Sequence, residues 1–313
     1  MVASVATRLQ RFINSLPAPA EEELKHYLAR VPVKPLRRLP SLSRLHARPY
    51  WIAFPVALTA HSVRGTWTLV RTRGFLHDVL CAQYYIYLAV RIRDDLLDGQ
   101  AEGRALSGVA NLLEGAAGEM LERYFERSSA FWRLLRLYKK QTAEGIKMVD
   151  QLQRRIGRNP GKMLDHFART SSIFKIGSAA VCVATGRVKL MRTIETIFNH
   201  LAIGGQSIDD VRDIVEDLRR SRYNYAVQML LKDCGRSGSP AEVFKEVLSA
   251  LLNPRNLEEV VSVAVRQFQA AHRLLKTVHL RELYGIPVVQ QRAAENLLHD
   301  IHRRRVAALF NWP

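Results

Sequence analysis

The sequence predicts an all-α protein, and three observations support that prediction. Seven of the twelve prolines fall at or before Pro55, and none lies between Pro55 and Pro160, where long helices can therefore run. Apolar residues recur every three to four positions from residue 56 onward, which is the period of an amphipathic helix. No alternation of apolar and polar residues ends in a hairpin turn, so we expect no strands.

The composition indicates a globular chain with a strong positive charge. Its 313 residues are 48% hydrophobic, and 47 lysines and arginines against 29 aspartates and glutamates give a formal charge of +18. This apolar content excludes a disordered chain. Three cysteines without a CxxC pair exclude a disulfide framework and a structural zinc site, and no uncharged run reaches the length of about 18 residues that spans a membrane. We expect a cytoplasmic protein that is attracted to polyanions.

Two segments are predicted along the chain: a basic, proline-rich leader over residues 1–50 and a single helical domain over residues 51–313. The start of the leader carries apolar residues at helical spacing, with Arg8 and Arg11 on the other side, which indicates a short amphipathic helix. Docking of this helix on the body is the favoured role, and peripheral membrane contact by the leader is the alternative. The apolar positions are Val2, Val5, Leu9, Phe12, Ile13 and Leu16.

Past the leader, the helical period continues to the end of the chain. Gly99 follows Asp98 as a helix-ending glycine. Pro160 marks a helix start, and Pro240 follows Ser239 as a proline behind a cap. The predicted helices span residues 56–73, 75–98, 104–126, 128–156, 160–185, 188–222, 240–252, 256–279 and 285–310.

The first of two acidic clusters closes the second of these helices. It reads Asp94-Asp95-Leu96-Leu97-Asp98, so that Asp94 and Asp98, four residues apart, project from one helix face. Like charges stacked in this way repel by roughly a few tenths of a kcal/mol, and only Arg91 and Arg93 offset them locally. A bound cation would remove the repulsion.

The second cluster lies inside the helix predicted over residues 188–222. Asp209, Asp213 and Asp217 follow an i, i+4, i+8 spacing, which drifts only about 40° around a helix over two turns, so they form a carboxylate ladder with Asp210 beside it. Oxygen ligands in this number suit a hard divalent cation that shares its coordination sphere with phosphate oxygens, and magnesium is the candidate. Further donors follow at Arg219, Arg220, Arg222 and Tyr223.

Each cluster alone has a second interpretation, a solvated helix face paired with neighbouring arginines. Two clusters together favour a metal site. An arginine-rich chain has no solubility reason to place unpaired carboxylates on the apolar-flanked sides of two separate helices. We therefore expect the carboxylates at 94/98 and at 209/213/217 to face one cavity mouth.

These motifs resemble those of the class I isoprenoid synthases, the helical superfamily of polyprenyl diphosphate synthases, squalene and phytoene synthases and terpene cyclases. The first cluster is similar to the DDxxD motif, and Gln206-Ser207-Ile208-Asp209-Asp210-Val211-Arg212-Asp213 is similar to the QxxDDxxD of polyprenyl synthases. Residues 212–217 also resemble the RDxxED of squalene and phytoene synthases. Upstream, Arg169-Thr170-Ser171-Ser172-Ile173-Phe174 resembles a basic-Thr-x-x-Leu-Phe segment of the same superfamily.

The resemblance implies an isoprenoid-synthase-type helical bundle around a central apolar cavity. It also implies a prenyl diphosphate substrate held through three magnesium ions, with manganese as a substitute, and no nucleic acid partner. A homodimer is usual in the superfamily. The implied metal ligands are Asp94, Asp98, Asp209, Asp210, Asp213 and Asp217, and Asp95 joins them in the catalytic set. The implied diphosphate-binding residues are Arg91, Arg169, Arg219, Arg222 and Tyr223.

A further set of side chains lies on the helix faces below the two clusters, or in the upstream motif, as candidates to line an apolar pocket. Aromatic ring faces stabilise a carbocation without capturing it, and an apolar lining excludes water. Ordinary helix packing is the competing role for the aromatic members of the set. The candidates are Leu80, Tyr84, Tyr87, Phe174, Phe198, Ala202 and Gln206.

Gly204 and Gly205 fall inside the same predicted helix as the second cluster, where each glycine costs about 1 kcal/mol relative to alanine. Such a pair indicates a close approach or a local break. Either a bound prenyl tail or a neighbouring helix could occupy the space.

One departure from the family pattern separates the candidate activities. Chain-elongating synthases follow the first motif with an Arg-Arg pair that holds a second diphosphate, whereas residues 99–104 here read Gly-Gln-Ala-Glu-Gly-Arg. The leading hypothesis is therefore a terpene synthase that ionises an allylic prenyl diphosphate and cyclises or deprotonates the carbocation, releasing pyrophosphate. The alternative is a prenyltransferase, either chain-elongating or head-to-head. A third hypothesis is a non-catalytic basic protein that binds anionic membranes or nucleic acid.

Overall fold

The computed structural model describes residues 4–31, 34–37, 40–62, 69–97, 99, 101–156, 160–232, 240–251 and 254–310. All regular secondary structure in these ranges is helical, as the sequence predicts. The α-helices are α1 (Val5–Asn14), α2 (Ala18–Arg30), α3 (Tyr50–Ser62), α4 (Leu69–Leu97), α5 (Leu106–Glu122), α6 (Ala130–Gln153), α7 (Gly161–Thr170), α8 (Ile176–Ala184), α9 (Met191–Arg212), α10 (Ile214–Arg219), α11 (Tyr225–Leu230), α12 (Pro240–Leu251), α13 (Pro254–Thr277) and α14 (Gly285–Phe310). Short 3₁₀ helices are η1 (Leu42–Ala47), η2 (Ser172–Lys175), η3 (Val188–Leu190) and η4 (Arg281–Leu283).

The helices fold into two compact units that alternate along the chain. Unit 1 comprises Met1–Leu137 and Ile173–Met191, and unit 2 comprises Tyr138–Ser172 and Arg192–Pro313. The first acidic motif belongs to unit 1 and the second to unit 2. No helix of the described ranges combines the length and the apolar character that crossing a bilayer requires.

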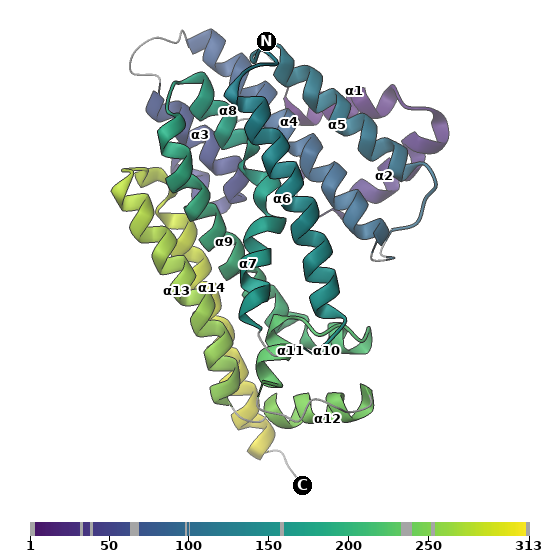
Figure 1. Cartoon of the computed structure of the whole chain (residues 1–313), viewed down its shortest axis with the longest axis vertical. Coiled ribbons are helices and arrows are strands. Elements are labelled where there is room, and N and C mark those ends of the chain that lie inside the picture. Colours follow the sequence, from purple (N-terminus) through teal and green to yellow (C-terminus); the bar gives the residue numbers. More distant parts are fainter. Residues whose placement is uncertain are drawn as a thin grey trace. The chain divides into compact units, whose positions relative to one another are not determined.

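Helix α4 is the central helix of unit 1. Every residue from Asp78 to Ala89 is buried, and a helix that is buried on all sides must be enclosed by other helices. Helices α1, α3, α5 and α8 all pack against it, and Figure 1 shows α4 and α5 running side by side. This enclosure fixes the helix whose last turn carries the first acidic motif.

Helix α3 corrects one sequence prediction. It begins at Tyr50 rather than at residue 56, and Pro55 lies inside it. An internal proline costs about 3 kcal/mol because it removes a backbone hydrogen bond. Burial of Trp51, Ile52 and Phe54 offsets that cost, since each large apolar side chain contributes about 1.5–3 kcal/mol. The remainder of the range predicted as helix 56–73 is divided, with residues 63–68 outside the described part.

The leader forms two helices that pack on unit 1. Helix α1 has the predicted amphipathic pattern, with Val5, Leu9 and Ile13 buried, and it contacts α4. Its Arg8 forms an ion pair with the buried carboxylate of Asp78 on α4. Helix α2 was not predicted; it contacts α1 and α5. The favoured role of the amphipathic helix, docking on the body, agrees with these contacts.

Two predicted helices of the central region are divided in the structure. The range 160–185 contains α7, the 3₁₀ turn η2 and α8, and the range 188–222 contains η3, α9 and α10. The short helix α11 was missed. Its first turn depends on a side-chain cap from Asn224, which accepts a hydrogen bond from the Val227 N–H at 2.9 Å.

In unit 2, α13 and α14 form a long antiparallel pair, visible side by side in Figure 1. Helix α9 runs without a break through both of its glycines, so of the two predicted alternatives, close approach and local break, the structure has the close approach. The two glycines differ in their surroundings. A Cβ added at Gly204 would lie 2.6 Å from the Phe268 ring of α13, whereas one added at Gly205 would meet nothing within 4 Å. Helix packing therefore explains Gly204, and Gly205 borders open space.

Replacing these glycines one at a time should change stability in opposite directions. We expect Gly204→Ala to lower the free energy of unfolding by about 1–3 kcal/mol, because the buried Phe268 ring must move. We expect Gly205→Ala to raise it by up to about 1 kcal/mol through helix propensity alone. Urea denaturation followed by circular dichroism measures both, and equal effects would contradict the assignment.

Candidate functional site

The first acidic motif occupies the last turn of α4. Asp95 is buried, with 9% of its surface exposed, and both carboxylate oxygens have donors within unit 1. The Tyr27 hydroxyl of α2 donates to Oδ2 at 2.7 Å, and Arg91 lies 3.0 Å from Oδ1. Asp94 is only half-buried. Asp98, the predicted partner of Asp94, lies outside the described residues.

Tyr27 was not recognised from the sequence as part of this motif. Its ring is buried, and burial first, then the hydrogen bond to Asp95, raises the pKa of its hydroxyl. The phenol therefore remains a proton donor at neutral pH. Arg91 contributes a permanent charge, because the carboxylates of Asp95 and Asp94 outweigh the effect of burial and raise the pKa of its guanidinium. The predicted role of Arg91 in diphosphate binding stays a prediction.

Removing the Tyr27 hydroxyl tests this arrangement. In Tyr27→Phe, the buried carboxylate of Asp95 loses one donor, so we expect the free energy of unfolding to fall by about 1–3 kcal/mol. Tyr284→Phe is the matched control, because the Tyr284 hydroxyl has no hydrogen-bond partner among the described residues, and we expect a change within about 0.5 kcal/mol. Chemical denaturation compares the two variants. Equal free energies of unfolding would contradict a stabilising role of the hydrogen bond between Tyr27 and Asp95.

Below the first motif, four aromatic rings gather in unit 1. The Trp51 ring of α3 stacks on Tyr87 with centroids 5.1 Å apart and on Phe174 with centroids 5.8 Å apart. Tyr84 and Tyr87 are buried on α4, as is Leu80, and their ring centroids lie 5.9 Å apart. Helical spacing and the upstream motif predicted Tyr84, Tyr87 and Phe174 as pocket-lining residues. Trp51 was not predicted, because it belongs to another helix and helical spacing relates only residues of one helix. We call Trp51, Tyr84, Tyr87 and Phe174 the aromatic cluster.

The second acidic motif spans a bend rather than a continuous helix, which corrects the prediction. Helix α9 ends at Arg212, and Asp213 stands between α9 and α10. The backbone nevertheless keeps the four-residue register, because the Asp213 N–H donates to the Asp209 carbonyl at 2.9 Å and the Asp217 N–H to the Asp213 carbonyl at 2.8 Å. Asp209 and Asp213 are exposed, and Asp217 is half-buried.

Asp210 differs from the other three aspartates of this motif. Only 3% of its surface is exposed, its Oδ1 accepts a hydrogen bond from Gln206 at 2.7 Å, and its Oδ2 accepts one from the Tyr225 N–H at 2.9 Å. Burial raises the pKa of this carboxyl to about 7. Gln206, predicted to line the pocket, thus has a structural partner, and the metal-ligand role of Asp210 stays a prediction.

Asn224 connects the two ends of the second motif. This fully buried amide donates to the Asp210 carbonyl at 2.9 Å and to Asp217 Oδ2 at 2.7 Å, while its oxygen caps α11. The turn before it has Ser221 in the left-handed region at φ 54°. In that turn the Arg222 N–H donates to the Asp217 carbonyl at 2.8 Å, as in a Schellman cap. The sequence signal for Asn224 is a helix-capping residue ahead of an apolar run.

The other predicted site residues of unit 2 are spread over several helices. Arg219 is exposed, and Arg222 and Tyr223 are half-buried. The Tyr223 N–H donates to the carbonyl of Gln153 at 2.7 Å, which ties this turn to the end of α6. Arg169 on α7 lies 3.9 Å from Glu144. Phe198 and Ala202 are buried on α9.

The carboxylates of the second motif fit a hard cation in chemistry. Loss of hydration, then the neighbouring Glu216, raises the pKa of Asp213, and burial also raises the pKa of Asp217 although Asn224 opposes it. Loss of hydration and, to a smaller extent, neighbouring carboxylates both disfavour the charged form here, and a bound divalent cation would favour it. Within the described residues, however, no three His, Cys, Asp or Glu side chains converge as a ready-made metal site.

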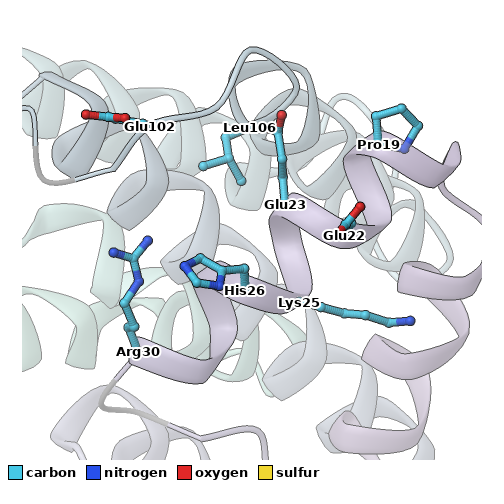
Figure 2. Close-up of a pocket in the computed structure, with 8 residues that line it drawn as sticks. All are labelled: Pro19, Glu22, Glu23, Lys25, His26, Arg30, Glu102 and Leu106. Atoms are coloured by element: carbon cyan, nitrogen blue, oxygen red, sulfur yellow. The ribbon is translucent and has the colours of Figure 1, made fainter.

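A hollow of about 660 Å³ lies beside the first motif in unit 1, between α2 and the segment that follows α4 (Figure 2). That segment is held at both ends: the Ala101 N–H donates to the Asp95 carbonyl at 3.0 Å, and the Ala105 N–H donates to Glu23 Oε2 at 3.0 Å. The side chains that line the hollow include three carboxylates and also basic groups, so their charge is mixed. Its lining residues are Pro19, Glu22, Glu23, Lys25, His26, Arg30, Glu102 and Leu106.

Comparison with known proteins identifies the fold. No family model matches the sequence, and no curated protein is significantly similar to it. Among solved structures, the chain is similar to heptaprenyl diphosphate synthase from Staphylococcus aureus, with a TM-score of 0.66, 15% identity, and coverage of 94% of this chain and 96% of that chain. The apo form of the Arabidopsis medium/long-chain length prenyl pyrophosphate synthase matches with a TM-score of 0.47 and 15% identity over 90% of this chain and 96% of that one.

The chain therefore has the helical fold of the class I isoprenoid synthases, and the fold prediction is confirmed. One of the solved structures with this fold, that of heptaprenyl diphosphate synthase, is matched over nearly its full length.

Proposed function

We propose that the protein is a magnesium-dependent prenyltransferase that lengthens an allylic prenyl diphosphate. The observation that carries this proposal is the end-to-end similarity of fold to heptaprenyl diphosphate synthase, which leaves neither chain with a large unmatched domain. This similarity favours the chain-elongating alternative over the terpene synthase that the missing arginine pair had placed first. The two acidic motifs supply the chemistry that such a reaction needs.

The carboxylates that are open to solvent are proposed to hold magnesium. Asp209 and Asp213 are exposed, and Asp217 has Asn224 to orient it. Asp94 is proposed to do the same on α4, whereas Asp95 and Asp210 are buried and act as anchors. Magnesium, or manganese in its place, neutralises the charge that develops on the departing diphosphate. Arg91 and Arg222 are proposed to donate hydrogen bonds to the diphosphate oxygens.

The aromatic cluster is proposed to receive the hydrocarbon part of the allylic substrate. Tyr87 stands seven residues before Asp94, which is two helical turns along the same face of α4. Ring faces attract a developing allylic cation, and an apolar lining would keep out water that could capture it. The burial of Leu80 next to the cluster supports this apolar role.

A terpene synthase remains the second candidate because of the segment after the first motif. Where a second diphosphate needs cations, this chain has Glu102 in the segment and Glu22 and Glu23 across the hollow, alongside the cations Lys25 and Arg30 (Figure 2). Carboxylates facing a diphosphate repel it. A reaction with a single diphosphate would not meet this repulsion.

Product analysis separates the two activities. The full chain is incubated with farnesyl diphosphate and Mg²⁺, with and without isopentenyl diphosphate, and the products are identified by mass spectrometry. The proposal expects a longer prenyl diphosphate that forms only when isopentenyl diphosphate is present. Hydrocarbon or alcohol released from farnesyl diphosphate alone would overturn it in favour of the terpene synthase. Absence of turnover with any prenyl diphosphate would overturn both.

A further inference from the structure

More than half of the net positive charge of this chain lies in one acid-free stretch. Residues 24–77 contain no aspartate or glutamate, but they contain ten lysines and arginines. The chain as a whole has 29 acidic residues among 313, or about one in eleven, so a stretch of this length without one is a strong local bias. The sequence therefore supplies no acidic neighbour along this stretch, which favours an external anion as the partner of its exposed cations.

The 3₁₀ helix η1 displays an exposed part of this stretch. All of residues 41–48 are exposed except Leu45, which is fully buried where η1 packs on α3. Leu42 is 40% exposed, an apolar side chain held among cations. We call Arg37, Leu42, Arg44, His46 and Arg48, all of them exposed, the basic face.

The arginines of the basic face lack internal counter-charges. In the part of the chain that the structure describes, no carboxylate pairs with Arg37, Arg44 or Arg48. Other arginines of unit 1 are engaged: Arg8 pairs with Asp78, and Arg93 lies 2.7 Å from Glu114. The charge of the basic face is therefore available to a partner outside the chain.

We propose that the basic face docks on an anionic membrane surface, with its arginines on lipid phosphates and Leu42 in the headgroup region. An exposed leucine between arginines gains free energy by entering an interface, whereas it gains nothing from a nucleic acid backbone. Single-stranded nucleic acid would instead need aromatic rings for base stacking, and residues 37–48 contain no Phe, Tyr or Trp. This docking is independent of the proposed reaction, although a prenyl substrate that partitions into membranes would make it useful.

Vesicle sedimentation without substrate or magnesium tests the proposal. The full chain is mixed with vesicles of phosphatidylcholine alone and with vesicles in which phosphatidylserine replaces a third of the lipid. We expect binding only to the anionic vesicles, weakened by salt. Each basic side chain near such a surface raises the binding constant about fivefold. We therefore expect about a hundredfold weaker binding for the triple variant Arg37→Gln/Arg44→Gln/Arg48→Gln. Leu42→Ser should weaken binding by a further few-fold.

The matched control removes the same charge elsewhere. Arg136→Gln/Arg281→Gln/Arg292→Gln replaces three exposed arginines outside the acid-free stretch, and we expect its vesicle binding to stay within about threefold of the wild type. If the two triple variants lost equal amounts of vesicle binding, net charge rather than the basic face would explain the binding, and the proposal would be overturned. Tighter binding to duplex DNA than to anionic vesicles at the same salt concentration would overturn it in favour of nucleic acid. Failure to bind vesicles would overturn it and leave the proposed reaction untouched.

Discussion

Replacing Asp213 by alanine should lower kcat for prenyl diphosphate turnover by about a thousandfold or more while leaving the fold intact. Asp213 stands in the bend between α9 and α10, and its side chain is exposed. Within the described residues its carboxylate takes part in no ion pair or side-chain hydrogen bond. Loss of hydration, then repulsion by Glu216, raises its pKa, and attraction by Arg212 and Arg220 opposes the shift. No close contact therefore makes this side chain necessary for stability, which favours a functional role.

The stability measurement makes this prediction specific. We expect the free energy of unfolding of Asp213→Ala to stay within about 0.5 kcal/mol of the wild type, since the repulsion from Glu216 and the attraction by Arg212 and Arg220 are removed together. Asp150→Ala is the control: Asp150 is a surface aspartate of unit 2 that pairs with Arg154 at 3.0 Å. We expect its turnover to stay within about twofold. Full activity of Asp213→Ala would refute the proposed metal-binding role.

The stability of the protein should fall as pH rises from about 4 to 7, and Asp210 should be a main cause. Burial raises its pKa from 3.8 to about 7, against the opposing hydrogen bonds from Gln206 and the Tyr225 N–H. Between these values the folded chain retains a proton that the unfolded chain has released. Each pH unit in that window therefore costs about 1.4 kcal/mol of folding free energy, up to a few kcal/mol in total. The contribution is complete below pH 3.8 and is lost as pH passes 7.

Asp210→Asn removes the titration but keeps the shape. Gln206 can turn its amide so that its oxygen accepts from the new side-chain NH₂, and the Asn oxygen still accepts from the Tyr225 N–H. The free energy of unfolding is measured by guanidinium denaturation at several pH values. Relative to the wild type, that of the variant should rise between pH 4 and 7, and above pH 7 the difference should stay constant. Asp150→Asn, on the surface, should show no such divergence. Parallel curves for Asp210→Asn throughout would refute the raised pKa.

Periodicity predicted the long helices because each has a buried face of its own. Helices α5, α6, α13 and α14 begin and end within a few residues of their predicted bounds. The misses are short elements whose ends depend on distant groups. Helix α11 starts where Asn224 meets Asp210 and Asp217, and helix α2 lies in the segment predicted as a proline-rich leader.

The candidate site was only partly predictable for a related reason. Acidic residues at a four-residue period could be read directly, since the period belongs to a single helix. The hydrogen bond between Tyr27 and Asp95 joins residues 68 positions apart, and Trp51 meets Tyr87 from another helix. Local spacing contains no information on such pairs. It also could not separate Gly204, set against Phe268, from Gly205, which faces open space.

The two leader helices have a consequence for any shortened form of this protein. Arg8 and Tyr27 come from α1 and α2, and each satisfies a buried carboxylate of α4, Asp78 and Asp95 respectively. Trimming the first thirty residues would strip the main helix of unit 1 of both partners and uncover the apolar surface beneath them. Arg91 would remain beside Asp95 and Tyr124 beside Asp78, but the apolar faces of α1 and α2 would be missing from unit 1, and we expect insoluble material rather than a smaller enzyme.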